Sequence, residues 1–235
     1  VPIGTKDKYQ YTSYWSKFTK ICESFGDAGV VETGCDGLIF IVYKNQGVAA
    51  VKSSYALTES LIIPDEIELD GSLYKVTGIH MQAFSNDNSI LSLALGKNVK
   101  SIGESAFSGC KKLSKITFND ELKYIGGSSF NSTAISELNL PDSVEYIGGG
   151  AFLYCSNLAD INLNKNIKSI GERVFNNTLW YKNQADGLIY KDDILFEHKG
   201  DCNIYESLEV KDGTRIVAGK ALQNVYCTRV VLPNS

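Results

Sequence analysis

Apolar residues recur along the chain with a period of 22 or 23 residues. Five phenylalanines, at positions 84, 107, 130, 152 and 175, are separated by 23, 23, 22 and 23 residues. Four of them close a segment of the form Ile-Gly-x-x-x-Phe, and in residues 102–107 and 147–152 an alanine precedes the phenylalanine. A fixed period of this length indicates a repeat protein in which each unit packs against its neighbours.

The other half of each repeat has apolar residues at positions i, i+3 and i+5. Residues 113–118, 135–140 and 158–163 follow this pattern, and the last two apolar positions alternate with a polar one. Such alternation predicts a short strand with one buried face. Stacked copies would form a parallel sheet with ~4.8 Å between strands. The Ile-Gly segment would return the chain on the opposite side, and the phenylalanines would form an aromatic column in the core.

A glycine follows the repeated isoleucine at positions 103, 126, 148 and 171. Glycine at a repeated position has two explanations, a close approach of neighbouring backbone or a positive φ angle. The sequence leaves both open.

The repeat resembles the BspA-like leucine-rich repeat, whose pattern is L-x-x-I-x-L-P-x-x-V-x-x-I-G-x-x-A-F-x-x-C. Ile135 to Cys155 matches it nearly position by position, and the resemblance covers roughly Leu57 to Ser235. It implies a leucine-rich-repeat solenoid of the α/β horseshoe class, rich in β-structure, with short turns or 3-10 segments on the return side. BspA-like proteins are commonly cell-surface proteins, and several are linked to adhesion or host contact.

The repeats divide the chain into four regions. Residues 1–56 are expected to form an N-terminal cap, with a helix at about 13–25 and a hairpin at about 36–51. Residues 57–178 are leucine-rich repeats. Residues 179–206 are a β-hairpin insertion of a kind familiar in BspA-like proteins, and 207–235 are a final incomplete repeat. The helix is expected to shield the core, with a separate partner-binding role as the alternative. Either the strand of this incomplete repeat is the last one, or the chain is a fragment of a longer repeat protein.

Composition limits the range of partners. The chain has 235 residues, 43% of them hydrophobic, and a formal net charge of −4, so nucleic acid is not expected as a partner. No apolar run reaches the ~20 residues of a membrane-spanning helix. The first residues lack the apolar core of a signal peptide, so either the protein is not secreted or such a peptide was removed before Val1. The resemblance favours an extracellular or cell-surface location, with signal peptide and anchor outside this chain.

The six cysteines include no CxxC pair, so a zinc or redox motif is not expected. Cys110 and Cys155 occupy the same position two repeats apart, ~10 Å from each other, and therefore predict small core residues that are not disulfide-bonded. Pairing of Cys22 with Cys35 is left open.

Other candidate chemistry is sparse. A Cys–His nucleophile would need His80 or His198 beside a free thiol. The acidic residues of 65–70 lack the spacing of a calcium loop and predict a solvated loop. We therefore expect no catalytic residue, metal or cofactor, and no enzymatic activity.

Side chains that alternate with buried strand positions must point to solvent. They would form a strip on the concave face that binds a protein or glycan ligand, including host-derived ones. Trp180 and Tyr181 are candidate aromatic anchors, unless they pack beneath the hairpin. A rigid spacer of a larger surface protein is the alternative function, and a Cys-dependent hydrolase is less favoured. The oligomeric state is left open. The strip residues are Lys115, Thr117, Glu137, Asn139, Asp160 and Asn162.

Overall fold

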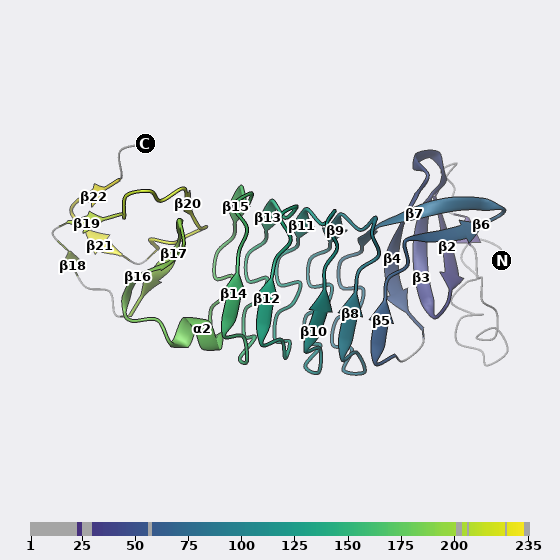
Figure 1. Cartoon of the computed structure of the whole chain (residues 1–235), viewed down its shortest axis with the longest axis horizontal. Coiled ribbons are helices and arrows are strands. Elements are labelled where there is room, and N and C mark those ends of the chain that lie inside the picture. Colours follow the sequence, from purple (N-terminus) through teal and green to yellow (C-terminus); the bar gives the residue numbers. More distant parts are fainter. Residues whose placement is uncertain are drawn as a thin grey trace.

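The computed structural model describes residues 23–24, 30–55, 58–200, 204–205, 207–223 and 225–232. Short strands stack side by side along the long axis of the molecule, with an antiparallel sheet at the N-terminal end and a smaller set of strands at the C-terminal end (Figure 1). This is the predicted parallel-strand solenoid, built mostly of β-structure.

The solenoid has two parallel strand ladders, one from each half of the repeat. The first ladder contains the three-residue strands, with each alternate side chain directed into the core. The second ladder contains the two-residue strands of the Ile-Gly segments, paired in register along its whole length. The first ladder comprises β5 (Ser60–Ile62), β8 (Ser92–Ala94), β10 (Lys115–Thr117), β12 (Glu137–Asn139) and β14 (Asp160–Asn162). The second comprises β9 (Ser101–Ile102), β11 (Tyr124–Ile125), β13 (Tyr146–Ile147) and β15 (Ser169–Ile170).

The predicted aromatic column runs through the core between the ladders. Neighbouring rings stack nearly parallel, with centroids 5.1 Å apart for Phe84 and Phe107 and 5.4 Å for Phe107 and Phe130. The column continues to Phe152 at 5.5 Å and to Phe175 at 5.7 Å. All five rings are buried. Stacked rings at this spacing bury a large apolar area in every turn.

The repeated glycine is explained by close backbone approach. A Cβ atom on Gly148 would lie 2.3 Å from the Gly127 nitrogen, and one on Gly126 would lie 2.6 Å from the Glu104 nitrogen. The positive φ angles occur elsewhere in the repeat, two residues before the phenylalanine, for example at Ser105 and Ser128.

The N-terminal sheet covers the first turn and continues into the second ladder. β2 (Val30–Cys35), β3 (Leu38–Tyr43) and β4 (Val48–Ser54) are antiparallel, with the 3-10 turn η2 (Lys44–Gln46) between β3 and β4. β4 pairs in parallel with β7 (Ser72–Ile79), which pairs with β9. Of the helix predicted at 13–25, the structure describes only Glu23–Ser24, which form strand β1 against β2.

The acidic segment 65–70, expected to be a loop, is mostly a strand. β6 (Glu66–Leu69) pairs antiparallel with β7, and Asp70 and Gly71 make the connecting turn with positive φ angles. Ile67 and Leu69 point into the core, whereas the acidic residues alternate with them and face solvent. The period-2 pattern was present in the sequence, but the density of acidic residues concealed it.

The C-terminal strands begin after a short helix. α2 (Leu179–Lys182) is capped by the Thr178 side chain, which accepts a hydrogen bond from Tyr181 N–H. β16 (Gly187–Lys191) and β17 (Ile194–Lys199) form an antiparallel hairpin, and β17 pairs in parallel with β20 (Ile216–Val217). Two parallel pairs follow, β18 (Ile204–Tyr205) with β21 (Tyr226–Cys227) and β19 (Leu208–Glu209) with β22 (Val230–Val231).

Candidate binding surface

The strip lies on the first ladder. Leu138 and Ile161, at the centres of β12 and β14, are 2% and 4% exposed. Their strand neighbours project outward, so all six strip residues are exposed. Strand pairing aligns them in rows, with Glu137 opposite Asp160 and Asn139 opposite Asn162, whose amide donates a 2.6 Å hydrogen bond to Asn139 Oδ1.

The first ladder is interrupted in the middle of the strip. β5, β8 and β10 form one sheet and β12 and β14 another, and among the described strands no pairing joins β10 to β12. Figure 1 shows the wider interval between these two strands. A groove of about 630 Å³ occupies the interval, lined by residues 114–118 on one bank and 136–141 on the other. We call this junction the split.

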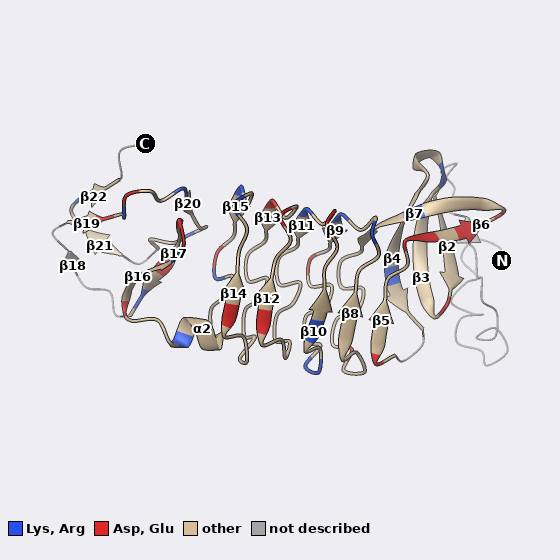
Figure 2. Cartoon of the chain, in the orientation of Figure 1, with Lys and Arg blue, Asp and Glu red and all other residues tan. Residues whose placement is uncertain are grey.

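The two banks of the split differ in charge. Lys115 lies on β10, and Lys111 and Lys112 lie in the turn before it. Glu137 and Asp160 lie at the corresponding positions of β12 and β14, so the strip changes from basic to acidic across the split (Figure 2). A ligand that crosses this junction meets a basic bank and then an acidic one.

Trp180 and Tyr181 lie at the end of the phenylalanine column. The Trp180 ring contacts the edges of Phe175 and Phe196, with centroids 5.7 and 5.8 Å apart. Tyr181 is partly buried beneath the hairpin, with the Lys199 ammonium 5.3 Å from its ring. Burial and the nearby Glu197 carboxylate raise the pKa of Tyr181. These contacts correspond to packing beneath the hairpin. Both side chains remain partly exposed, and their role as anchors stays a prediction.

The two repeated cysteines are buried thiols. The Sγ atoms of Cys110 and Cys155 each donate to a carbonyl of the preceding repeat, Phe84 and Phe130 respectively, at 3.0 Å. Burial raises the pKa of Cys110 to about 12, and it also raises the pKa of Cys155. A thiol with so little thiolate at neutral pH is a poor nucleophile.

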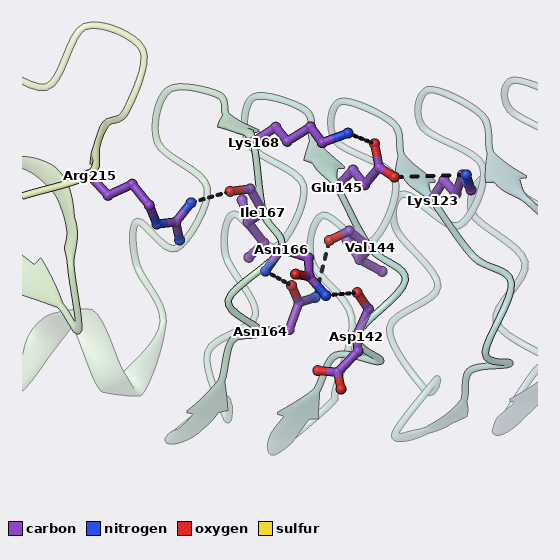
Figure 3. Close-up of polar contacts among 9 residues, drawn as sticks. All are labelled: Lys123, Asp142, Val144, Glu145, Asn164, Asn166, Ile167, Lys168 and Arg215. Carbon is purple, nitrogen blue, oxygen red and sulfur yellow. Dashed lines mark hydrogen bonds and ion pairs between the residues drawn. The ribbon is translucent and has the colours of Figure 1, made fainter.

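A repeated asparagine that the sequence analysis did not single out ties neighbouring turns together. Asn164 Nδ2 donates to the carbonyls of Pro141 and Val144, at 2.6 and 3.1 Å. Asn119 makes the equivalent bonds to Gly96 and Val99. Figure 3 shows the Asn164–Val144 bond among the inter-turn contacts near the second ladder. Its position in the repeat was the available signal, because Asn recurs there after the strand.

An ion-pair row beside the second ladder was also missed. Lys168 Nζ lies 2.6 Å from Glu145 Oε2, and Lys123 Nζ lies 3.8 Å from Glu145 Oε1 (Figure 3). Lys168 lowers the pKa of Glu145, through a hydrogen bond and its charge. The Tyr124 and Tyr146 rings stack nearby, with centroids 4.9 Å apart.

The described residues provide neither a metal site nor a membrane-spanning helix. They contain no group of three or more His, Cys, Asp or Glu side chains placed to hold a metal ion. None of their helices has both the length and the apolar character needed to cross a membrane.

Solved structures with the same fold come from bacterial leucine-rich-repeat proteins. The T. pallidum leucine-rich repeat protein TpLRR aligns with a TM-score of 0.58 and 20% identity, over 86% of each chain. The pneumococcal vaccine antigen PcpA aligns with a TM-score of 0.54 and 18% identity, over 88% of this chain and 65% of its own. Among curated proteins, none matches the sequence.

The sequence also matches the family description "BspA type Leucine rich repeat region". The match has 6 copies and spans residues 77–185, which carry the phenylalanine column, the second ladder and the first ladder from β8 onward. This match supports a protein-interaction or structural role. Residues 77–185 are therefore a leucine-rich-repeat region of the BspA type.

Proposed function

We propose that the chain is a non-catalytic binding module of a cell-surface or secreted protein, and that it recognises a protein or glycan ligand through the strip. The observation that carries this proposal is the strip itself. Six exposed polar side chains project from the strands of the first ladder, in register between β12 and β14, and the side chains that alternate with them are buried or partly buried. Repeat proteins use extended faces of this kind to contact partners.

The charge pattern of the strip supports recognition over simple solvation. Lys115 stands on one bank of the split and Glu137 and Asp160 on the other, and none of the three takes part in an ion pair that would fix it within the described residues. By contrast, Glu145 and Lys168 beside the second ladder are paired with each other. Side chains without internal partners can pair with a ligand without first breaking an internal contact.

Lys115→Ala, Glu137→Ala and Asp160→Ala combined in one protein test the proposal. We expect attachment to immobilised host-matrix proteins or arrayed glycans to fall about tenfold or more, because several polar contacts disappear together. Surface plasmon resonance and glycan arrays measure the loss.

A second triple variant provides the matched control. Lys100, Glu121 and Asp142 have the same charges, are exposed and lie outside the strip. Their replacement by alanine should leave attachment unchanged. Equal attachment by both triple variants and the unaltered chain would favour the rigid-spacer role.

A further inference from the structure

The split opens one wall of the solenoid only. Paired strands lie about 4.8 Å apart, whereas at least one of the three corresponding Cα pairs of β10 and β12 is more than 8 Å apart. On the other wall, β11 pairs in register with both β9 and β13. The Phe107 and Phe130 rings remain stacked at 5.4 Å. The turns are therefore held together at the second ladder and core, and separate at the first ladder.

A missing residue accounts for part of the opening. Six positions separate Phe107 from Leu113, whereas five separate Phe130 from Ile135, which produces the single 22-residue interval. The shorter turn still bonds to the preceding repeat, through Ala134 N–H and the Leu113 carbonyl at 2.9 Å. This bond lies before the first apolar position of the turn, whereas in the neighbouring turns it lies after it, as from Ser114 N–H to the Leu91 carbonyl at 3.0 Å.

The asparagine tie is missing at the same junction. Pro141 occupies the position that Asn119 and Asn164 hold in the adjacent repeats, and its side chain has no hydrogen-bond donor. Asn119 and Asn164 each donate to two carbonyls of the repeat before them. At Pro141 no equivalent bonds are possible, so the β12 turn lacks this amide tie to the β10 turn.

The split leaves main-chain groups unpaired on both banks. Leu95 N–H donates to the Thr117 carbonyl, and Leu140 N–H donates to the Asn162 carbonyl, at 3.0 and 3.2 Å. Within the described chain, Phe118 makes no corresponding bond to Asn139. Two facing strand edges with free donors and acceptors are suited to an extended backbone, because one inserted strand can pair with both.

The side chains of the banks define what such a strand would carry. Ile116 and Phe118 are only partly buried, whereas their counterparts Leu138 and Leu140 are buried. Inward residues of an inserted strand would therefore be apolar and cover this floor. Outward residues would lie between Lys115 and Glu137, where a charge of either sign faces a like charge, so a neutral polar or small side chain fits best.

We propose that the split binds an extended strand of a partner protein, which pairs with β10 and β12 and alternates apolar inward residues with neutral outward ones. The inference rests on the proposed function, because it assigns a ligand class to the centre of the strip. An inserted strand would restore one continuous sheet from β5 to β14.

An end-blocked, fluorescent peptide copying residues 89–98 is a suitable probe. It has Ser92 and Ala94 in the outward positions and Leu93 and Leu95 in the inward ones. Fluorescence anisotropy with the whole chain should show saturable binding. The same peptide with alternate backbone nitrogens methylated should bind at least about tenfold more weakly, because main-chain hydrogen bonds are lost while the side chains are kept.

A variant of the protein in which β10 and β12 pair should weaken peptide binding. Insertion of one glycine after Ser132 restores the 23-residue interval, and Pro141→Asn restores the amide tie. We expect the combined variant to bind the peptide about tenfold weaker, as β10 and β12 pair with each other. Pro141→Asn alone, checked for folding by circular dichroism, covers the case in which the insertion prevents folding. It should weaken binding in the same direction.

Hydrogen exchange locates the bound peptide. Phe118 and the β12 amides should become protected when the peptide binds. The inference would be overturned if the unmodified peptide did not bind, if the methylated peptide bound equally well, or if protection appeared elsewhere. It would also be overturned if a glycan, and not the peptide, protected these amides. The strip triple variant separates the two proposals, since it should lose host-matrix attachment yet retain the peptide, whose contacts are mainly to backbone.

Discussion

The glycine after each repeated isoleucine allows neighbouring turns of backbone to touch. At Gly148, the site of a Cβ atom is already occupied by the Gly127 nitrogen and Cα of the preceding turn. Gly149, one residue later, has its nearest atoms at 3.4 Å and a negative or extended φ angle. Two adjacent glycines therefore have different roles, and only the first is required by packing.

Gly148→Ala should destabilise the protein by about 1–3 kcal/mol, because the added methyl group overlaps backbone that cannot rotate away. Gly149→Ala should change stability by less than about 1 kcal/mol, since the methyl group meets ordinary contacts and the unfolded chain loses entropy. Urea unfolding of the two variants measures the difference. Equal losses would mean that close backbone approach is not the reason for the first glycine.

At the scale of the element, Asn119 and Asn164, two residues after their first-ladder strands, each tie a turn of the solenoid to the turn before it. Asn164 is buried, and its Oδ1 accepts a 2.7 Å hydrogen bond from Asn166 N–H while its amide bonds to the preceding turn. One side chain thus shapes its own turn and holds the neighbouring turn. Replacement of this asparagine by Pro141 coincides with the place where the first ladder separates.

Asn164→Ala should destabilise the fold by about 1–3 kcal/mol, because the Val144 carbonyl loses its hydrogen bond from the amide and the Pro141 carbonyl keeps only the one from Val144 N–H. Lys165→Ala, at the next position and exposed, is the control and should change stability by no more than about 0.5 kcal/mol. Thermal and urea unfolding give both values. An Asn164→Ala variant with unchanged stability would show that the strands alone hold adjacent turns in place.

At the scale of the whole molecule, the C-terminal strands continue the stack through a few specific contacts. Arg215 pairs with Asp193 at 2.7 Å and also donates to the Ile167 carbonyl of the last complete repeat (Figure 3). Gly219 N–H donates to the Ile170 carbonyl at 3.2 Å. In a molecule whose units contact only their neighbours, loss of such a junction affects stability locally.

Arg215→Ala should therefore increase amide exchange in β17 and β20 while β8, β9 and β11 keep their protection. Hydrogen-exchange mass spectrometry resolves these segments. The control is Arg229→Ala, an exposed arginine farther along the chain, which should leave β17 and β20 unchanged. Uniform loss of protection in the Arg215→Ala variant would indicate that the molecule unfolds as a single cooperative unit.

The sequence by itself determined the repeat, the strand positions and the interior column. Phe107, Phe130 and Phe152 recur in phase with the alternating strand pattern, so each could be assigned to the core from local spacing. These features follow from local sequence patterns that recur in every repeat.

Only the tertiary structure decided how the solenoid responds to its irregularities. The 22-residue interval and Pro141 were visible in the sequence, but either ladder or the column could have absorbed them. The column and the second ladder stayed in register because stacked rings and contacting backbone leave no room to shift. The first ladder opened because its pairing was the least constrained contact between those two turns. Trp180 likewise packed inward because Phe175 and Phe196, distant in sequence, form one apolar site for its ring.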